Sequence, residues 1–385
     1  MPVVGNTQDA NKEADQNAAS APAFPSTSQL QGLHKPAWLQ KVFEREHSPE
    51  EPSSHSQYWS AKDEWAEWEP NSILFSPERG AAVLRNLRLD KADIAKGMFC
   101  SISLFENENG EKLAGKISMG TSYYKNEIAE ELEAYKTIYQ AKGIGPHPNL
   151  VNVYGIAIVP GKNGDLYRAL IMDAIPGPTG QKTFDALRQC WDSNKISNAE
   201  YWSAIQFIGR RLLDVVEHIA KAGVVHNDIK PENFLVNRET GEPVLIDLGM
   251  WCKKGKRANG RTPLYASPES LQRRSVGEKS DVFSTGASLL HGIEGKTARR
   301  PNQGLLYLKT PLKDGARNIK RQPGVYSVKT AYTDFMHQVL RYDIFFHTFF
   351  RLNARQAKEH AFLNDSMLDD DTAKEVIKKV LSWTA

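Results

Sequence analysis

Residues 223–249 constrain the fold of this chain more than any other stretch. They contain two short apolar runs, at 234–236 and 244–246, that are typical of buried strands. The residues between these runs favour a tight turn, so the stretch predicts a loop followed by a hairpin. Such a hairpin brings polar residues from both flanks to one end. There they could orient a hydroxyl group, contact a phosphate and bind magnesium: Asp228, Lys230, Asn233 and Asp247.

The loop and the end of the hairpin carry two motifs, His-Asn-Asp-Ile-Lys-Pro-Glu-Asn at 226–233 and Asp-Leu-Gly at 247–249. These motifs resemble the catalytic loop and the metal-binding motif of eukaryotic-type protein kinases. The resemblance implies ATP and Mg²⁺ as cofactors, with catalysis by positioning and charge neutralisation. It also implies a base for the attacking hydroxyl, a contact to the transferring phosphate, two metal ligands and a structural histidine. These are, in order, Asp228, Lys230, Asn233 with Asp247, and His226.

The glycine-rich loop of that family corresponds to residues 94–103, but two of its three glycines are replaced here. The three positions are Ala95, Gly97 and Cys100, and we expect Ala95, Gly97 and Ile102 to contact the nucleotide. A side chain crowds the close approach of the backbone to a phosphate. The replacements therefore favour weaker nucleotide binding or a different loop shape.

A lysine and a glutamate are expected next to the phosphates. Residues 112–117 match the third strand of the family, which implies that Lys116 pairs with the phosphates of ATP. Its partner should be one of four glutamates on the predicted helix at 126–138. Glu131 lies beside the apolar stripe of that helix, so we choose Glu131, with Glu130 as the alternative.

The apolar stretch that ends near residue 175 resembles the fifth strand and the hinge between the two lobes of a kinase. The resemblance places Met172 behind the adenine, with hydrogen bonds to adenine from the backbones of Asp173 and Ile175. Residues 197–221 have apolar side chains at helical spacing and lead directly into the catalytic loop,. They resemble the helix on which the large lobe is built.

The activation segment, 247–269, is rich in basic residues. This composition favours an acidic or phosphorylated protein partner, although a solvated surface would look the same. The segment ends with Ser-Pro-Glu, and the resemblance implies an ion pair between Glu269 and Arg351. It also implies that Asp281 braces the backbone of the catalytic loop.

Asn227 stands where most protein kinases have an arginine that binds a phosphorylated residue of the activation segment. An amide carries no charge and cannot form a bidentate pair with phosphate. We therefore expect activity without phosphorylation of this segment and without Thr262. The segment would be held by its own packing, with Leu264 and Tyr265 as anchors, or by a bound partner. The alternative is a weakened switch that works through basic residues of the segment.

Composition excludes several classes of protein. Three cysteines without paired spacing argue against a disulfide framework or a zinc site and favour a reducing compartment,. The net charge of +3 is close to balance and does not indicate a basic surface for nucleic-acid binding,. No apolar run approaches the roughly 18 residues of a membrane span, and the N-terminus lacks a secretory signal peptide. We expect a cytoplasmic protein or, alternatively, one that is secreted into the cytoplasm of a host cell.

The expected fold is α+β and bilobal, as in protein kinases, with a small β-rich lobe at 86–175 and a larger helical lobe at 176–365. A C-terminal helix is expected at 366–385. Residues 33–85 hold four of the eight tryptophans and favour helices at 36–45 and 58–68, which would pack on the domain or dock a partner,. Residues 1–32 are too polar to order. In composition they resemble the N-termini of bacterial type III secretion effectors.

The expected function is that of a serine/threonine protein kinase, because Lys230 two residues after Asp228 is the family's pattern for such substrates. A pseudokinase that only binds nucleotide or protein is the first alternative, and the altered glycine loop is its support. A small-molecule kinase of the aminoglycoside or choline type is the second alternative. Those relatives lack the long activation segment and the Glu269–Arg351 pair.

Overall fold

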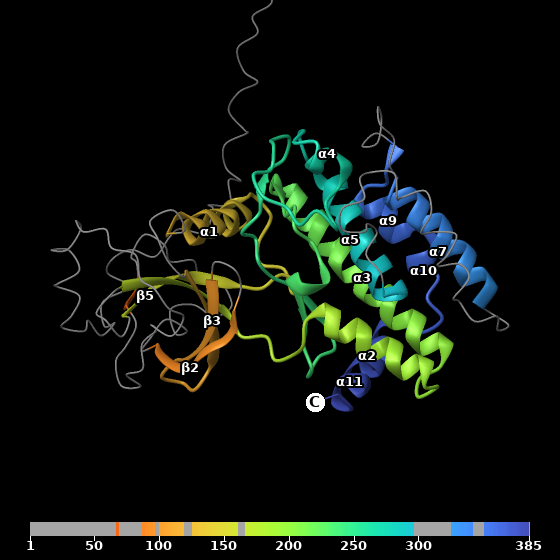
Figure 1. Ribbon diagram of the computed structural model, residues 1–385, viewed down its shortest axis with the longest axis horizontal. Helices are drawn as coiled ribbons and strands as arrows, with labels where there is room; N and C mark the ends of the chain where they lie inside the picture. The colour runs from red at the N-terminus through yellow and green to blue at the C-terminus, as the bar shows by residue number, and fades with distance from the viewer. Residues whose placement is uncertain are drawn as a thin grey trace, which may run out of the picture.

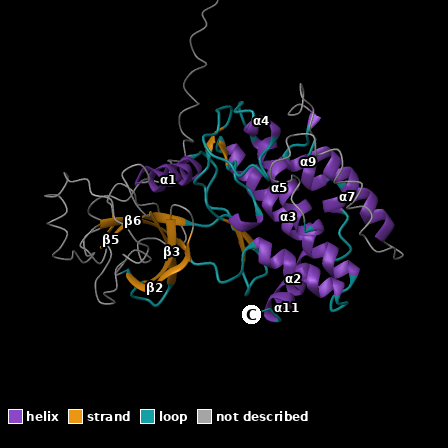
Figure 2. Ribbon diagram, viewed as in Figure 1, coloured by secondary structure: helices purple, strands orange, loops and turns teal. Residues whose placement is uncertain are grey.

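The computed structural model describes residues 67–68, 87–96, 100–118, 125–160, 166–295, 325–341 and 350–384. Strands and one helix form a small lobe, and most helices gather in a second lobe beside it (Figure 1). Colouring by secondary structure makes the division plain (Figure 2). The expected α+β fold with a β-rich lobe and a helical lobe is confirmed.

Six strands form one antiparallel sheet in the order β1-β5-β6-β4-β3-β2. Alternate residues of a strand face opposite sides of a sheet. In β6, Ala169 and Ile171 accordingly join one core cluster, while Leu170 and Met172 join another that includes buried residues of α1. The bounds are β1 Glu67–Trp68, β2 Arg88–Lys96, β3 Cys100–Glu106, β4 Lys112–Ser118, β5 Val153–Pro160, β6 Leu166–Asp173 and α1 Lys125–Gln140.

Strand β1 corrects one expectation from the sequence. The helix predicted at 58–68 is wrong for its last two residues, because Glu67 and Trp68 pair with Ile158 and Ala157 of β5. An edge strand presents unpaired backbone groups, and pairing with them outweighs a weak local preference for helix. The rest of 33–85, except these two residues, lies outside the described residues, as does 1–32.

The helical lobe is organised around α3, which begins with a capping box formed by Ser197 and Glu200,. Its apolar side chains are buried on nearly every side, and it contacts α5, α9 and α11. The bounds are α2 Gly180–Asp192, α3 Asn198–Lys221, α4 Pro268–Leu271, α5 Glu278–Glu294, α7 Val325–Val339, α9 Ala354–Glu359, α10 Ala361–Asn364 and α11 Asp370–Ser382.

The predicted hairpin packs against the helical lobe, where β8 (Phe234–Val236) contacts α2 and β9 (Pro243–Leu245) contacts α3. Within the hairpin, Phe234 pairs with Leu245. The second strand therefore begins one residue earlier than expected. Three short elements flank the hairpin: β7 at Val224–Val225, the 3-10 turn η5 at Pro231–Asn233 and β10 at Cys252–Lys253. None of the described helices is long and apolar enough to cross a membrane.

Candidate active site

Lys116 lies at the centre of an ion cluster between the lobes. It extends from β4, and its Nζ is 2.7 Å from Glu131 Oε2 on α1 and 2.7 Å from Asp247 Oδ1 after β9. Glu131 is almost fully buried, whereas Glu130 is exposed. The structure therefore pairs Lys116 with Glu131 rather than with the alternative glutamate.

The three charges of this cluster control one another's protonation. Burial would lower the pKa of Lys116, but the two carboxylates outweigh it and hold that pKa well above its ordinary value. Burial raises the pKa of Glu131, and the Lys116 charge opposes this rise. Burial would also raise the pKa of Asp247, but Lys116 outweighs it and lowers the pKa to about 2. Asp247 is therefore a carboxylate at neutral pH.

The conformation at Asp247 depends on Gly249, the glycine two residues later. Asp247 has a left-handed backbone with φ of 65°, and its Oδ1 accepts a hydrogen bond from Gly249 N at 3.1 Å. A Cβ at position 249 would lie 2.9 Å from that oxygen, so a side chain there would displace the carboxylate. The N–H of Leu248 donates to Glu131 Oε1 at 3.0 Å, which joins the Asp-Leu-Gly motif to α1.

Asp228 is held by three donors in the catalytic loop and the activation segment. Its Oδ2 accepts from Lys230 Nζ at 2.7 Å and from Asn233 Nδ2 at 2.9 Å. Its Oδ1 accepts from the backbone N–H of Thr262 at 2.9 Å. Lys230 Nζ also donates to Thr262 Oγ1 at 2.8 Å. The carboxylate thus has a fixed orientation and only about 4% exposure.

His226 and Asp281 fix the conformation of the catalytic loop through hydrogen bonds. Asp281 accepts from the backbone N–H of His226 and of Asn227, each at 2.8 Å. Burial raises the pKa of Asp281 to about 7, against the lowering effect of these two donors. His226 Nε2–H donates to Ile246 O, its Nδ1 accepts from Asp228 N–H, and burial lowers the pKa of the ring. A neutral His226 therefore links the loop to the hairpin.

Glu269 and Arg351 form an ion pair in the helical lobe. Arg351 Nη1 is 2.7 Å from Glu269 Oε1, and the two side chains are 0% and 1% exposed. The same guanidinium donates to Lys279 O, and Ser280 Oγ donates to Glu269 Oε1. Burial would raise the pKa of Glu269, but Arg351 outweighs it and lowers the pKa.

The expected nucleotide contacts line β2, β3, β4 and the hinge. Ala95 pairs with Ile102, and Ile102 pairs with Lys116, so these positions lie side by side in the sheet. Gly97 lies outside the described residues. Met172 is buried at the end of β6, and Asp173 N–H already donates to Asn152 O. The backbone N–H of Asp173 is therefore already bonded within the protein.

Comparison with known proteins decides the family. A model of the protein kinase domain matches residues 90–363. This chain belongs to the protein kinase family. Protein kinase YpkA of Yersinia pseudotuberculosis is 38% identical over 314 residues, which cover 80% of this chain and 42% of YpkA.

Kinases from other organisms match shorter parts of the chain. The serine/threonine-protein kinase pakA of Talaromyces marneffei is 31% identical over 144 residues, which cover 36% of this chain and 22% of pakA. CBL-interacting serine/threonine-protein kinase 24 of Arabidopsis thaliana is 26% identical over 209 residues, covering 52% and 43% of the two chains. This chain spans less than half the length of YpkA.

Protein kinases use ATP and a divalent metal, and the donors at the kinase site fit that metal. Asn233 uses its Nδ2 to hold Asp228, which leaves its Oδ1 as an acceptor. The Asp247 side chain is 38% exposed and can reach a ligand in the cleft. The described residues contain no group of three or more His, Cys, Asp or Glu that could hold a metal ion alone. Asn233 and Asp247 would therefore need phosphate oxygens to complete the coordination.

Two contacts of the kinase site were missed by reading the sequence. Thr262 was expected to be dispensable, yet its N–H and hydroxyl contact Asp228 and Lys230. Trp251 donates from its indole Nε1 to Glu130 O at 2.7 Å, one residue before the glutamate that pairs with Lys116. Its position two residues after Gly249 was the available signal, because a large side chain there follows directly on the metal-binding motif.

The expected anchors of the activation segment are partly present. Tyr265 is buried, and its hydroxyl lies 2.5 Å from His291 Nδ1 on α5. Leu264 packs against the main core cluster. Asn227 contributes further bonds, from its buried amide to Gly260 O and from Ser270 Oγ to its Oδ1. These neutral contacts add to the bonds that join Thr262 to Asp228 and Lys230 and Arg261 to Ser270 O, and none of them involves a phosphate.

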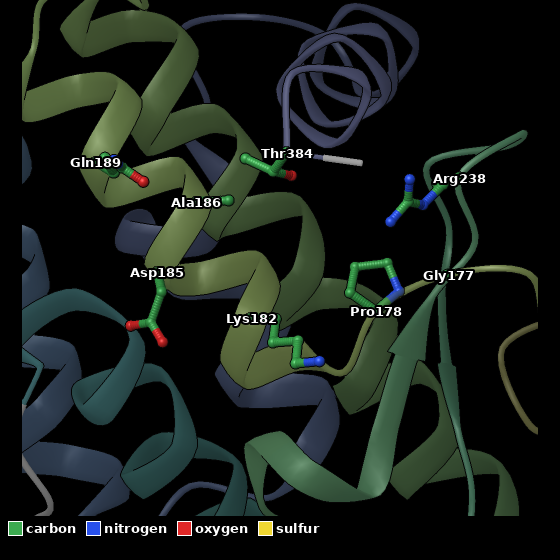
Figure 3. A pocket seen from close by; sticks show the side chains of 8 residues that line it. All are labelled: Gly177, Pro178, Lys182, Asp185, Ala186, Gln189, Arg238 and Thr384. Atoms are coloured by element: carbon green, nitrogen blue, oxygen red, sulfur yellow. The ribbon is translucent and has the colours of Figure 1, made fainter. Parts of the chain in front are cut away.

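A surface pocket lies apart from the catalytic loop (Figure 3). It is bounded by α2, the turn after β8 and the end of the chain near Thr384. Lys182 and Arg238 extend into it, and it contains none of the residues expected to bind nucleotide or metal. The residues around Lys116 and Asp228 are therefore the candidate active site.

Proposed function

We propose that this chain transfers the γ-phosphate of MgATP to serine or threonine hydroxyls of proteins. The observation that carries the proposal is the orientation of Asp228 by Lys230, Asn233 and Thr262. A buried carboxylate with fixed geometry suits a group that accepts a proton from an attacking hydroxyl.

Each of the other groups has a role in this proposal. Lys116 contacts the phosphates of ATP, and Glu131 holds the lysine in place. Lys230 neutralises charge on the phosphoryl group as it transfers, because it is already within reach of the base and of Thr262. Asp247 and Asn233 would hold Mg²⁺, which supplies charge neutralisation on the phosphates when bound.

The adenine would bind at the hinge. Among the described residues, neither the N–H nor the C=O of Ile175 has a hydrogen bond within the protein. Such a residue is suited to form backbone hydrogen bonds with a ligand. Met172 would pack behind the ring, and the Asp173 carbonyl would accept from the amino group of adenine. Ala95 and Ile102 would cover the nucleotide from the sheet, with Gly97 beside the phosphates.

We also propose that the kinase is active without phosphorylation of its activation segment. Asn227 cannot pair with a phosphate, and its amide is already bonded within the protein. Thr262 is bonded to the base and to Lys230, so its hydroxyl is not a free acceptor for phosphate in this conformation. Treatment with a phosphatase should leave the initial rate of the purified protein nearly unchanged.

The protein substrate is proposed to be acidic near its phosphorylated residue. Four basic residues of the activation segment are exposed, and no ion pair holds them among the described parts of the chain: Lys253, Lys254, Lys256 and Arg257. Charges of this kind attract an acidic substrate and are screened by salt. The rate with an acidic peptide should fall more steeply with ionic strength than the rate with a neutral peptide.

Delivery into a host cell is the proposed alternative to a cytoplasmic location. The polar composition of 1–32 and the similarity to a Yersinia kinase support it. We also propose that the tryptophan-rich residues 33–85 dock a partner protein. Fusion of 1–32 to a reporter tests delivery, and failure of the reporter to leave a bacterium with a type III system would contradict it.

One experiment tests the proposed reaction. Purified protein is incubated with radiolabelled ATP, Mg²⁺ and a generic protein substrate, and phosphoserine and phosphothreonine are counted. Asp228→Ala should lower the rate by about 10²- to 10⁴-fold, as loss of a positioned base does, while the protein remains folded at the assay temperature. The pseudokinase alternative, which the replaced glycines at Ala95 and Cys100 favour, predicts ATP binding with no incorporation in either protein.

A further inference from the structure

Asn227 is an unusual residue at the heart of the catalytic loop. It precedes Asp228, has a left-handed backbone with φ of 64°, and is only 3% exposed. Asparagine tolerates this backbone conformation better than most residues. A buried amide needs hydrogen bonds for both its nitrogen and its oxygen. All the side-chain bonds of Asn227 reach the activation segment or the residues that follow it.

The amide joins three separate points of the chain. Its Nδ2 donates to Gly260 O and makes a longer contact of 3.5 Å with Met250 O. Its Oδ1 accepts from Ser270 Oγ, on α4, at 2.9 Å. A Cβ at Gly260 would lie 1.9 Å from Met250 Sδ. The parts of the activation segment around Met250 and Gly260 are therefore in contact next to the Asn227 amide.

This arrangement ends on the catalytic base. Two residues after Gly260, the N–H of Thr262 donates to Asp228 Oδ1, and its hydroxyl accepts from Lys230. Because Asn227 and Asp228 are adjacent, the contacts form a closed ring from the loop to the segment and back. Displacement of Gly260 would move Thr262 and release one oxygen of the base.

We infer that Asn227 is a positioning residue that orients Asp228 through Gly260 and Thr262. The inference rests on the proposed function and goes beyond it, because it assigns to a neutral amide the ordering of the segment around the base. Asn227 does not touch the reacting atoms in this arrangement. Its loss should therefore slow the chemical step and leave ATP binding unchanged.

The first test uses Asn227→Gly, which removes the amide and keeps a residue that accepts the left-handed backbone. We expect kcat to fall about tenfold, as loss of two or so hydrogen bonds implies, with the KM for ATP within about twofold of wild type. Asn194→Gly is the matched control, because Asn194 is an exposed asparagine with φ of 55° beyond α2. It should keep the wild-type kcat.

The second test asks whether Asn227 acts through its bonds to the segment. Ser270→Ala removes a partner of the same amide. If the bonds carry the effect, Asn227→Gly combined with Ser270→Ala should therefore lose little more than the more damaging single variant. Losses that multiply, an equal rise in the KM for ATP, or a wild-type kcat for Asn227→Gly would each overturn the inference. If Asn227→Gly does not fold, Ser270→Ala alone replaces it, and a wild-type kcat for that variant would overturn the inference. An inactive wild-type protein would instead contradict the proposed function.

Discussion

The Lys116 cluster and the Glu269–Arg351 pair are built differently. In the Lys116 cluster, Asp247 keeps 38% of its side chain exposed and Lys116 keeps 14%. In the Glu269–Arg351 pair the exposed fractions are 1% and 0%. The first cluster is open to solvent at Asp247, so its charges can exchange partners with a nucleotide. The second is sealed, and its charges have only each other and nearby protein groups.

The difference teaches that a buried ion pair is not by itself a sign of catalysis. Both pairs shift the pKa of a carboxyl downward through a neighbouring cation that outweighs burial. Only exposure and the surrounding donors separate them. Glu269 accepts from Ser280 Oγ and the Arg351 guanidinium, whereas Asp247 accepts from Lys116 Nζ and the backbone N–H of Gly249.

The same substitution at the two cations gives the largest expected contrast. Arg351→Met leaves Glu269 buried without its partner and should lower the free energy of unfolding by about 3–5 kcal/mol. Lys116→Met should lower the rate by about 10²- to 10³-fold, as loss of an electrostatic contact to the reacting group does. Its stability should fall less, because water can reach Asp247 and because Glu131, whose pKa burial raises, can take up a proton once Lys116 is gone.

Urea unfolding and the radiolabelled assay, run well below the melting temperature, measure these two effects. Arg274→Met is the control for Arg351, because Arg274 is exposed. If both variants lost the same stability, or if Arg351→Met lost as much activity as Lys116→Met while still folded, the distinction between the pairs would be wrong.

Acid should weaken both pairs, by amounts that depend on exposure. The pKa of Asp247 is about 2 in the folded protein, below its ordinary value of 3.8. A carboxyl with a lowered pKa contributes stability above its ordinary pKa and loses it as the pH falls toward the folded value. Asp247→Asn should therefore reduce the loss of unfolding free energy between pH 5 and pH 3, by at most about 1 kcal/mol because solvent screens the group.

Salt sharpens this prediction, since it screens exposed charges more than sealed ones. Added salt should shrink the part of the acid loss that Asp247→Asn removes. A part that does not shrink with salt would show that Asp247 is as sealed from solvent as Glu269.

The smallest effect is expected on the α1 side of the Lys116 cluster. Trp251→Phe keeps the ring and removes the N–H that donates to Glu130 O, next to Glu131. Because the bond is solvent-exposed, kcat/KM should fall only about two- to fivefold, near the low end for one hydrogen bond. Trp191→Phe is the matched control, since its Nε1 donates to Asn198 at the same 2.7 Å within the helical lobe. Equal rates for the two variants would remove Trp251 from the site.

Much of the candidate site could be predicted because its residues sit in regular or motif-bearing segments. The helical spacing in α1 pointed to Glu131 rather than Glu130, and the structure pairs it with Lys116. The apolar runs on either side of the turn predicted the hairpin that ends on Asp247 to within one residue. Local periodicity carries this information because side chains three or four apart share a helix face and alternate ones share a strand face.

The tertiary structure alone decided contacts between irregular segments. The amide of Asn227 could have bonded water or a neighbouring turn, and Gly260 and Ser270 become its partners only when the activation segment folds back over the loop. Trp68 entered a strand because β5 offered an edge, and Trp251 reached α1 because the lobes meet there. Loop residues have no regular spacing in the sequence from which a contact partner could be predicted. The sequence alone therefore determined which chemical groups are present and in what order, and packing of distant segments determined which of them meet.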